Sequence, residues 1–331
     1  MNQTSLLIDH VAEKALSGEG LPQELALRLL RIEAPEDIHL LLARANQVRR
    51  RTRGDEIELC AIVNARSGRC PEDCAFCAQS ARYRTDIDVY PLLAPEKIVE
   101  AARAAGEQGV SRFSVVISGK GVRPGPELDR IAEAIRGIAG LGLSPCASLG
   151  ILNEESAGVL KEAGLVSYHH NLETSPDFYP RICTTHSIEE RLQTARLAKA
   201  TGFRLCCGGI IGLGEPPESR VKLAYALRDL GPDSVPLNFL NPIPGTPLQD
   251  QPPLPPLEIL KTIALFRLVL PHVDIRTCGG RERNLRGLQP LMFLAGANAT
   301  MTGNYLTTTG RSPREDVQDI LDLGLKLKSR V

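Results

Sequence analysis

From Glu58 onward the sequence alternates between short runs rich in β-branched and apolar residues and longer runs that carry the period of a helix. Seven short runs predict strands, and we expect an eighth strand within residues 291–300. The seven cover residues 58–65, 112–118, 144–151, 166–172, 203–211, 234–240 and 272–278. Strict alternation indicates parallel strands, and eight repeats favour a closed (β/α)8 barrel of the TIM type over a doubly wound open sheet. The predicted fold class is therefore α/β.

The first 53 residues stand outside this pattern, because they contain three amphipathic segments and no run that reads as a strand. We therefore expect an N-terminal helical extension over residues 1–53 and a barrel domain over residues 54–325. A last helix is expected near the C-terminus, in residues 314–327.

Composition restricts the kind of partner. Lysine plus arginine and aspartate plus glutamate number 39 each, so the chain lacks the basic excess that binds nucleic acid. The first residues do not read as a secretory signal or a transit peptide, and no apolar run approaches the roughly 20 residues that span a bilayer. We expect a cytoplasmic protein with a small-molecule substrate and without nucleic-acid or membrane partners. In that reducing compartment the nine cysteines predict metal ligands or catalytic thiols rather than disulfides.

Three of these cysteines, Cys70, Cys74 and Cys77, follow the first predicted strand directly. Barrel enzymes carry their chemistry on the loops after strands, so this loop is the first candidate site. The C-x3-C-x2-C spacing differs from the paired C-x2-C of zinc fingers. Three thiolates with one open position fit a 4Fe-4S cluster whose fourth iron binds an external ligand. A zinc site completed by a remote cysteine is the alternative.

The loop, with the aromatic Phe76 before its last cysteine, resembles the signature of radical S-adenosylmethionine enzymes. Seven segments between residues 64 and 311 further resemble, in order, the biotin synthase family of that superfamily. These segments are NARSGRCPEDCAFCAQSARYRT, YHHNLETS, ICTTH, CGGIIGLGE, PLNFLNPIPGTPL, GGRERNLR and NYLTTTGR. Seven motifs in register are far more specific than the cysteine loop alone.

This resemblance implies two cofactors at the loop. The three cysteines would hold a 4Fe-4S cluster, and its open iron would bind S-adenosyl-L-methionine. The residues implied to contact that cofactor are Phe76, Asn171, Glu173, Gly208, Gly212 and Glu215. The glycines belong to a Gly-x-Ile-x-Gly-x-x-Glu pattern, which by itself is also typical of a tight turn between a strand and a helix.

The fourth predicted strand carries candidate substrate contacts. Strand alternation sends His169, Asn171 and Glu173 to one face and His170 to the other, and the polar set is expected inside the barrel. The resemblance implies that His169, Asn171 and Asn238 contact the substrate, with Asn238 on the ureido group of dethiobiotin. The family motif has asparagine at the position of His169 and aspartate at that of Glu173, a departure that affects substrate recognition.

The resemblance also implies an auxiliary iron-sulfur cluster, 2Fe-2S or larger, that supplies the sulfur. In the family three cysteines and an arginine on four strands bind it, which gives Cys146, Cys206 and Arg276 catalytic, metal-binding roles. The remaining cysteine position holds Ser114, and serine is a poor iron ligand beside thiolates. Cys278 shares the orientation of Arg276 by alternation, so Ser114 or Cys278 would complete the site.

Two other cysteines, Cys60 and Cys183, follow no such pattern and are expected in core or loop packing. The buried-packing interpretation also remains an alternative for the auxiliary set, because free cysteine is commonly a small buried apolar residue.

The expected function is that of a sulfurtransferase, the radical insertion of sulfur into dethiobiotin to form biotin. The resemblance further implies a flavodoxin- or ferredoxin-type electron donor and a homodimer. Two alternatives stay open: a lipoyl synthase-like insertion of sulfur into an octanoyl group, and a non-catalytic iron-sulfur or zinc scaffold or sensor.

Overall fold

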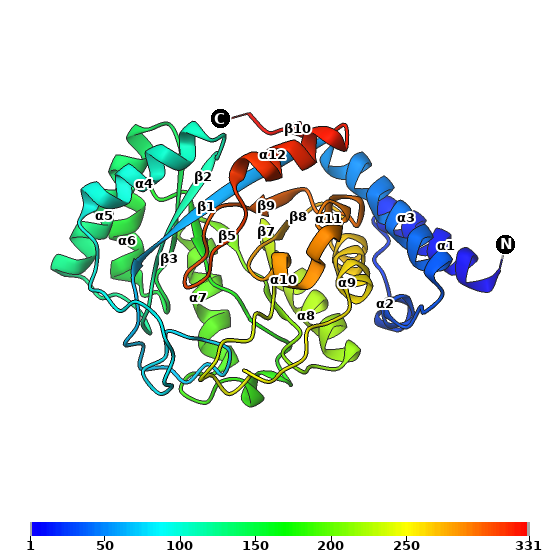
Figure 1. Ribbon diagram of the computed structural model, residues 1–331, viewed down its shortest axis with the longest axis horizontal. Coiled ribbons are helices and arrows are strands. Elements are labelled where there is room, and N and C mark those ends of the chain that lie inside the picture. Colours follow the sequence, from blue (N-terminus) through cyan, green and yellow to red (C-terminus); the bar gives the residue numbers. More distant parts are fainter. Residues whose placement is uncertain (1, 330–331) are drawn as a thin grey trace.

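The computed structural model describes residues 2–329 and shows a ring of parallel strands enclosed by helices (Figure 1). The strands are β1 (Glu56–Arg66), β2 (Arg112–Ile117), β3 (Ser144–Ser148), β4 (Ser167–His169), β5 (Arg204–Cys206), β6 (Gly209–Ile211), β7 (Ser234–Phe239), β8 (Asp274–Thr277), β9 (Ala299–Met301) and β10 (Lys326–Leu327). The strands from β1 to β5 and from β7 to β9 pair in chain order, β5 and β6 both pair with β7, and β9 pairs with β1, which closes the ring. Because β5 and β6 share one position and β10 lies outside the ring, eight positions remain, and the predicted (β/α)8 barrel is confirmed.

Helices cover the outside of the ring. They are α4 (Pro95–Glu107), α5 (Pro126–Gly140), α6 (Glu154–Glu162), α7 (Ile188–Ala200), α8 (Pro217–Leu230), α9 (Pro256–Val269), α10 (Arg281–Leu285), α11 (Leu291–Leu294) and α12 (Pro313–Asp322), with short 3-10 turns η1 (Tyr179–Arg181) and η2 (Arg286–Leu288). Their ends follow local signals. Ser187 and Glu190 exchange side-chain and backbone hydrogen bonds where α7 begins, and Gly231, at φ 65°, ends α8.

The eighth strand occupies only the end of the segment in which it was expected. Residues 291–294 form the short helix α11, and β9 begins at Ala299. Met292 and Phe293 are buried on that helical turn. A short apolar run lacks a periodicity that would distinguish a buried helix from a buried strand, which is why only a strand was expected in this segment.

Strand alternation separates the barrel interior from the apolar layer beneath the helices. On β2, Phe113, Val115 and Ile117 belong to the main hydrophobic core, whereas Arg112 and Ser114 line a cavity inside the ring. The same period of two operates on the other strands, so polar side chains and thiols gather in the interior.

The first 53 residues form α1 (Gln3–Ser17), α2 (Gln23–Leu30) and α3 (Pro35–Arg53), as the amphipathic spacing predicted. These helices pack against α8 and α9 on the outside of the barrel (Figure 1). The buried ammonium of Lys261 donates to the carbonyl oxygens of Leu30 at 2.8 Å and Ile32 at 2.7 Å, which fastens the extension to α9. The division into two domains at residue 53 stays a prediction. Among the described residues, no helix combines the length and apolar character needed to cross a membrane.

Candidate active site

A cavity of about 410 Å³ lies at the carboxyl-terminal ends of the barrel strands. Its walls come from segments that follow those strands, which is where barrel enzymes place their chemistry. Six cysteines line it: Cys70, Cys74 and Cys77 from the loop after β1, and Cys60, Cys206 and Cys278 from the barrel. The predicted contacts Phe76, His169, Asn171, Glu173 and Asn238 line it as well.

The cysteine loop is held in shape by its own backbone. The N–H of Cys70 donates to Gln79 O at 3.0 Å, the N–H of Ala81 donates to Cys70 O at 2.7 Å, and the N–H of Cys77 donates to Cys74 O at 2.9 Å. Burial raises the pKa of Cys77 to about 11. A metal cluster binds the deprotonated form, so its binding must displace that proton. Three thiols on one preformed loop, with open cavity beside them, fit the cluster that the sequence predicts.

A second segment braces the loop from outside. The carboxylate of Asp73 accepts the N–H groups of Thr184 at 2.9 Å and Thr185 at 3.1 Å, and the N–H of Ala75 donates to Ile182 O at 2.8 Å. These contacts join the cluster loop to the ICTTH motif, more than 100 positions later in the chain. The motif therefore supports the cysteine loop.

Cys183 packs in a buried cluster with Cys74, Phe178 and Ile182, so the expected packing is confirmed, and this packing places it beside the cluster loop. Its sulfur is 3.8 Å from that of Cys74 and 3.3 Å from Nδ1 of His186, which in turn lies 2.5 Å from a carboxylate oxygen of Glu72. Hydrogen bonds, first from Cys74 and then from His186, lower the pKa of Cys183 below its usual range. The C-x2-H spacing of Cys183 and His186 was the signal available in the sequence.

The residues after β4 approach the cavity differently from the prediction. β4 ends at His169, and the backbone then leaves the extended conformation, with Glu173 at φ 68°. His169, Asn171 and Glu173 line the cavity, but His170 lines it too. The predicted outward orientation of His170 is wrong because strand alternation does not continue past the end of a strand.

A buried arginine organises this polar group. Arg191, on α7, donates to Asn171 O at 2.8 Å and lies 3.5 Å from the Glu173 carboxylate, which also accepts from the Asn171 side chain at 3.3 Å. Burial raises the pKa of Glu173, and Arg191 opposes that shift. No sequence motif indicated Arg191, because it lies on a helix rather than in one of the strand motifs.

The glycine motif lies behind the cavity wall. A Cβ at Gly208 would meet Pro236 O at 1.9 Å, so glycine is required there by the neighbouring strand. Glu215 is buried and accepts the N–H of Gly212 at 3.0 Å. From this motif, Ile210 lines the cavity, whereas Gly208, Gly212 and Glu215 do not. Their cofactor contacts stay predictions.

Asn238 lies on β7, directly beside this motif, because Ile210 of β6 is its register partner. Its amide nitrogen donates to Gly209 O at 3.3 Å, and its amide oxygen accepts the N–H of Gly279 at 3.1 Å. One amide hydrogen and one lone pair remain for a ligand, as a ureido group would require.

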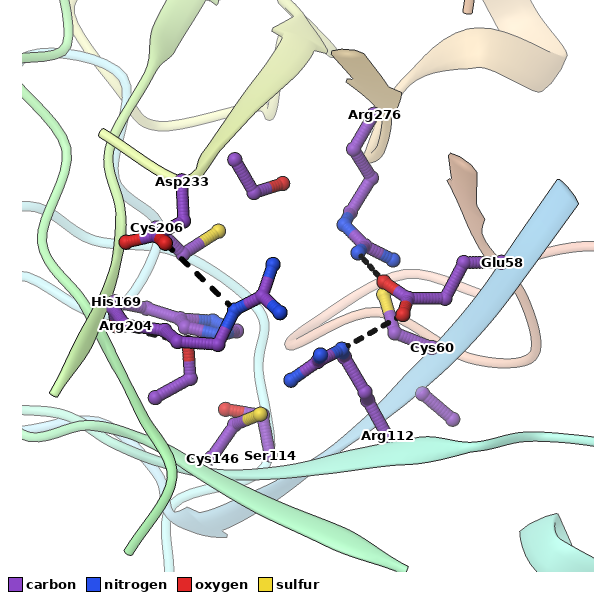
Figure 2. A pocket seen from close by; sticks show the side chains of 13 residues that line it. Glu58, Cys60, Arg112, Ser114, Cys146, His169, Arg204, Cys206, Asp233 and Arg276 are labelled. Atoms are coloured by element: carbon purple, nitrogen blue, oxygen red, sulfur yellow. Dashed lines mark hydrogen bonds and ion pairs between the residues drawn. The ribbon is translucent and has the colours of Figure 1, made fainter. Parts of the chain in front are cut away.

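A smaller cavity of about 10 Å³, the size of one water molecule, lies inside the barrel (Figure 2). Figure 2 shows that it brings together the predicted auxiliary residues Cys146, Cys206, Arg276 and Ser114. Cys60 joins them, contrary to the expectation of core packing.

The two cavities are separated by a thin layer of side chains. Cys60, His169, Cys206 and Arg276 line both of them, so these residues form the floor of the larger cavity. Cys278 lines the larger cavity alone.

Ion pairs surround the smaller cavity. Glu58 is paired with Arg276 and, at 2.9 Å, with Arg112 (Figure 2). Burial alone would raise the pKa of Glu58, but Arg276, Arg112 and the more distant Lys328 hold it well below its usual range. Arg204 and Asp233, 3.9 Å apart, lie on the side of the amino-terminal strand ends.

The thiols at this site are neutral in the absence of a metal. Burial raises the pKa of Cys146 to about 11 and that of Cys206 to about 12, while Arg276 favours the thiolate form of each. Soft sulfur donors beside a fixed cation fit a sulfide-bridged iron cluster, whose binding would deprotonate them.

Two family models match the chain. The radical SAM superfamily matches residues 65–227, and the biotin and thiamin synthesis associated domain matches residues 236–326. The first contains the cysteine loop, and the second contains Arg276 and Cys278.

Curated relatives match over nearly the whole length. The biotin synthase of Geobacter sulfurreducens is 52% identical over 321 residues, which cover 97% of each chain. That of Desulforudis audaxviator is 50% identical and covers 98% of this chain and 99% of its own.

Solved structures support the fold. Methylornithine synthase superposes with a TM-score of 0.84 at 22% identity, covering 97% of this chain and 98% of its own. The FeFe-hydrogenase maturase HydG from Carboxydothermus hydrogenoformans gives 0.78 at 20% identity, covering 96% and 78%.

Proposed function

Because the chain belongs to the biotin synthase family of radical S-adenosylmethionine enzymes, we propose that its barrel cavity binds dethiobiotin between two sulfur-ligated clusters and inserts sulfur to form biotin. The chain is a radical enzyme of the sulfurtransferase class, with a 4Fe-4S cluster, S-adenosylmethionine and an auxiliary iron-sulfur cluster as its cofactors. The assignment of individual residues to these groups is the proposal.

One observation carries this proposal: the cysteine loop places thiols on the wall of the larger cavity, and other thiols lie in the floor of the same cavity. A substrate held between them faces a radical source on one side and a sulfur source on the other. When bound, the reduced 4Fe-4S cluster with S-adenosylmethionine supplies the radical that removes hydrogen, and the auxiliary cluster supplies the sulfur.

The chain's own residues position the reactants. Cys70, Cys74 and Cys77 hold the first cluster, while Glu173, oriented by Arg191, accepts hydrogen bonds from the ribose hydroxyls of the cofactor. Phe76 supplies an apolar wall next to the loop. The remaining predicted cofactor contacts, Gly208, Gly212 and Glu215, would act through the backbone that presents Ile210.

The substrate side consists of His169, Asn171 and Asn238, which line the same cavity. Asn238 has one donor and one acceptor position left, which complements a cyclic urea. Burial, with Arg276 and Arg112 nearby, lowers the pKa of His169 to about 3, so its imidazole is neutral and offers one donor and one acceptor.

An electron donor must approach the cysteine loop. Arg69, Arg82 and Arg84 are exposed around that loop and would favour an acidic partner of the flavodoxin or ferredoxin type. A homodimer remains a further proposal from the family.

An anaerobic assay tests the function. The protein is reconstituted with iron and sulfide, reduced, and given S-adenosylmethionine and dethiobiotin, and the products are measured by mass spectrometry. We expect biotin and two molecules of 5'-deoxyadenosine for each biotin. Deoxyadenosine without biotin, together with sulfur insertion into an octanoyl substrate, would contradict the assigned substrate.

A further inference from the structure

We propose that Cys60 supplies the third thiolate of the auxiliary cluster, at a site where the family position on β2 is occupied by Ser114. This inference rests on the proposed function, because it concerns the cluster that donates sulfur. It assigns a metal-binding role to a residue that follows no family motif.

Placement is the first argument. Cys60 lines the small cavity together with Cys146, Cys206 and Arg276 (Figure 2). It lies on β1, the strand that neighbours β2 in the ring. In the register of these strands, Cys60 lies opposite Arg112, two residues before Ser114. The side chains of Cys60 and Ser114 both point into the barrel. Cys60 on β1 can therefore supply the thiolate that the family has on β2 at the position of Ser114.

The second argument is the position of Cys60 in the floor. Cys60, Cys206 and Arg276 line both cavities, whereas Ser114 lines the lower one alone. A cluster that passes sulfur to a substrate must contact the upper cavity. Cys60 meets this requirement together with two residues already predicted as ligands.

The same comparison ranks Cys278 behind Cys60. Cys278 lines the upper cavity and not the lower one. It therefore does not share a cavity with Cys146, whereas Cys60 does. The ligand set that the structure favours is Cys60, Cys146 and Cys206, with Arg276 beside them.

Donor chemistry gives the third argument. Iron-sulfur clusters are held by cysteine thiolates, and soft thiolate donors are preferred to hydroxyl oxygen. The hydroxyl of Ser114 and Nη1 of Arg276 are buried and have no hydrogen-bond partner within residues 2–329. Both can donate a hydrogen bond to cluster sulfur, and a bound cluster would thus satisfy them.

The test isolates the auxiliary cluster. Cys70, Cys74 and Cys77 are all changed to alanine in the full chain, so that any iron that remains bound belongs to the auxiliary site inside the barrel. This parent is compared with versions that also carry Cys60→Ser, Ser114→Ala or Cys207→Ala. Cys207 follows Cys206 directly but packs in the outer core, which makes it the matched buried-cysteine control. Each protein is reconstituted anaerobically and examined for iron, sulfide, Mössbauer spectrum and thermal unfolding.

We expect Cys60→Ser to lose more than half of the parent's iron without a change in the unfolding temperature of the iron-free protein, and Ser114→Ala and Cys207→Ala to retain the iron. The exchange variant Cys60→Ser/Ser114→Cys should recover iron, because the thiolate then returns to the family position. Retention of iron in Cys60→Ser, or an equal loss in Ser114→Ala, would overturn the assignment of Cys60. A parent that binds no iron would contradict the two-cluster function itself, and the two failures are thereby distinguished.

Discussion

The sulfur atoms of Cys74 and Cys183 lie 3.8 Å apart, although 109 positions separate these residues in the chain. Because the pKa of Cys183 is lowered, its thiolate can attack oxidised glutathione, and Cys74 can then displace the bound glutathione. When cluster-free protein is incubated with oxidised glutathione, we expect a Cys74–Cys183 disulfide and the release of two molecules of reduced glutathione. Peptide mapping under non-reducing conditions detects it. Protein loaded with its 4Fe-4S cluster should not form this disulfide. Equal oxidation of the cluster-free and the cluster-loaded protein would show that Cys74 is not a cluster ligand.

The carboxylate of Asp73 joins the cluster loop to the segment that contains Thr184 and Thr185. Asp73→Ala removes this brace and should accelerate loss of iron from the 4Fe-4S site by roughly 10- to 100-fold, the range found when groups behind metal ligands are removed. Iron release to a chelator under anaerobic conditions measures the rate. Asp86→Ala changes an exposed carboxylate farther along the same loop and should leave the rate unaltered.

Substitution of a cysteine in the cysteine loop should have a different effect on activity from substitution of a cysteine in the cavity floor. Cys74→Ala should abolish both the cleavage of S-adenosylmethionine and biotin formation, because the 4Fe-4S cluster loses a ligand. Cys206→Ala should retain cofactor cleavage and lose sulfur insertion. Deoxyadenosine and biotin, measured in one anaerobic reaction, distinguish the two outcomes. Near-normal biotin formation in both variants would refute the two-cluster arrangement.

His169 should make the cofactor-free protein sensitive to acid. Burial, followed by the charges of Arg276 and Arg112, lowers the pKa of His169 to about 3, below its ordinary value of 6.5. Between these values the unfolded chain binds a proton that the folded chain does not, so stability is full above pH 6.5 and falls as the pH decreases. The loss amounts to about 2 kcal/mol at pH 5.

His169→Asn should remove this share of the pH dependence. Thermal unfolding between pH 7 and pH 5 should show a smaller decrease in unfolding temperature for the variant than for the wild type. Substitution of the exposed His39 by asparagine provides the control and should behave like the wild type. An unchanged pH profile in His169→Asn would mean that His169 binds its proton as readily in the folded chain as in the unfolded chain.

The barrel could be predicted because periodicity is a local property of the sequence. The cysteine loop could be predicted for the same reason, since its three ligands lie within one short segment. The positions of Cys60 in the cavity floor and of Cys183 beside Cys74 could not be predicted, because each depends on the distance to a residue on another strand or loop. His170 was misplaced by continuing the alternation of β4 beyond His169, where the strand ends.

The ion pair of Arg204 and Asp233 has a consequence for how the enzyme is replenished. Their side chains are 40% and 44% exposed, although both line the small cavity with Cys146 and Cys206. Water at the amino-terminal end of the barrel is therefore one side-chain layer from the thiols, whereas the substrate cavity lies at the carboxyl-terminal end. If the auxiliary cluster is held by these thiols, as proposed, sulfide would reach it from behind the substrate, and resupply and product departure would not compete for one opening.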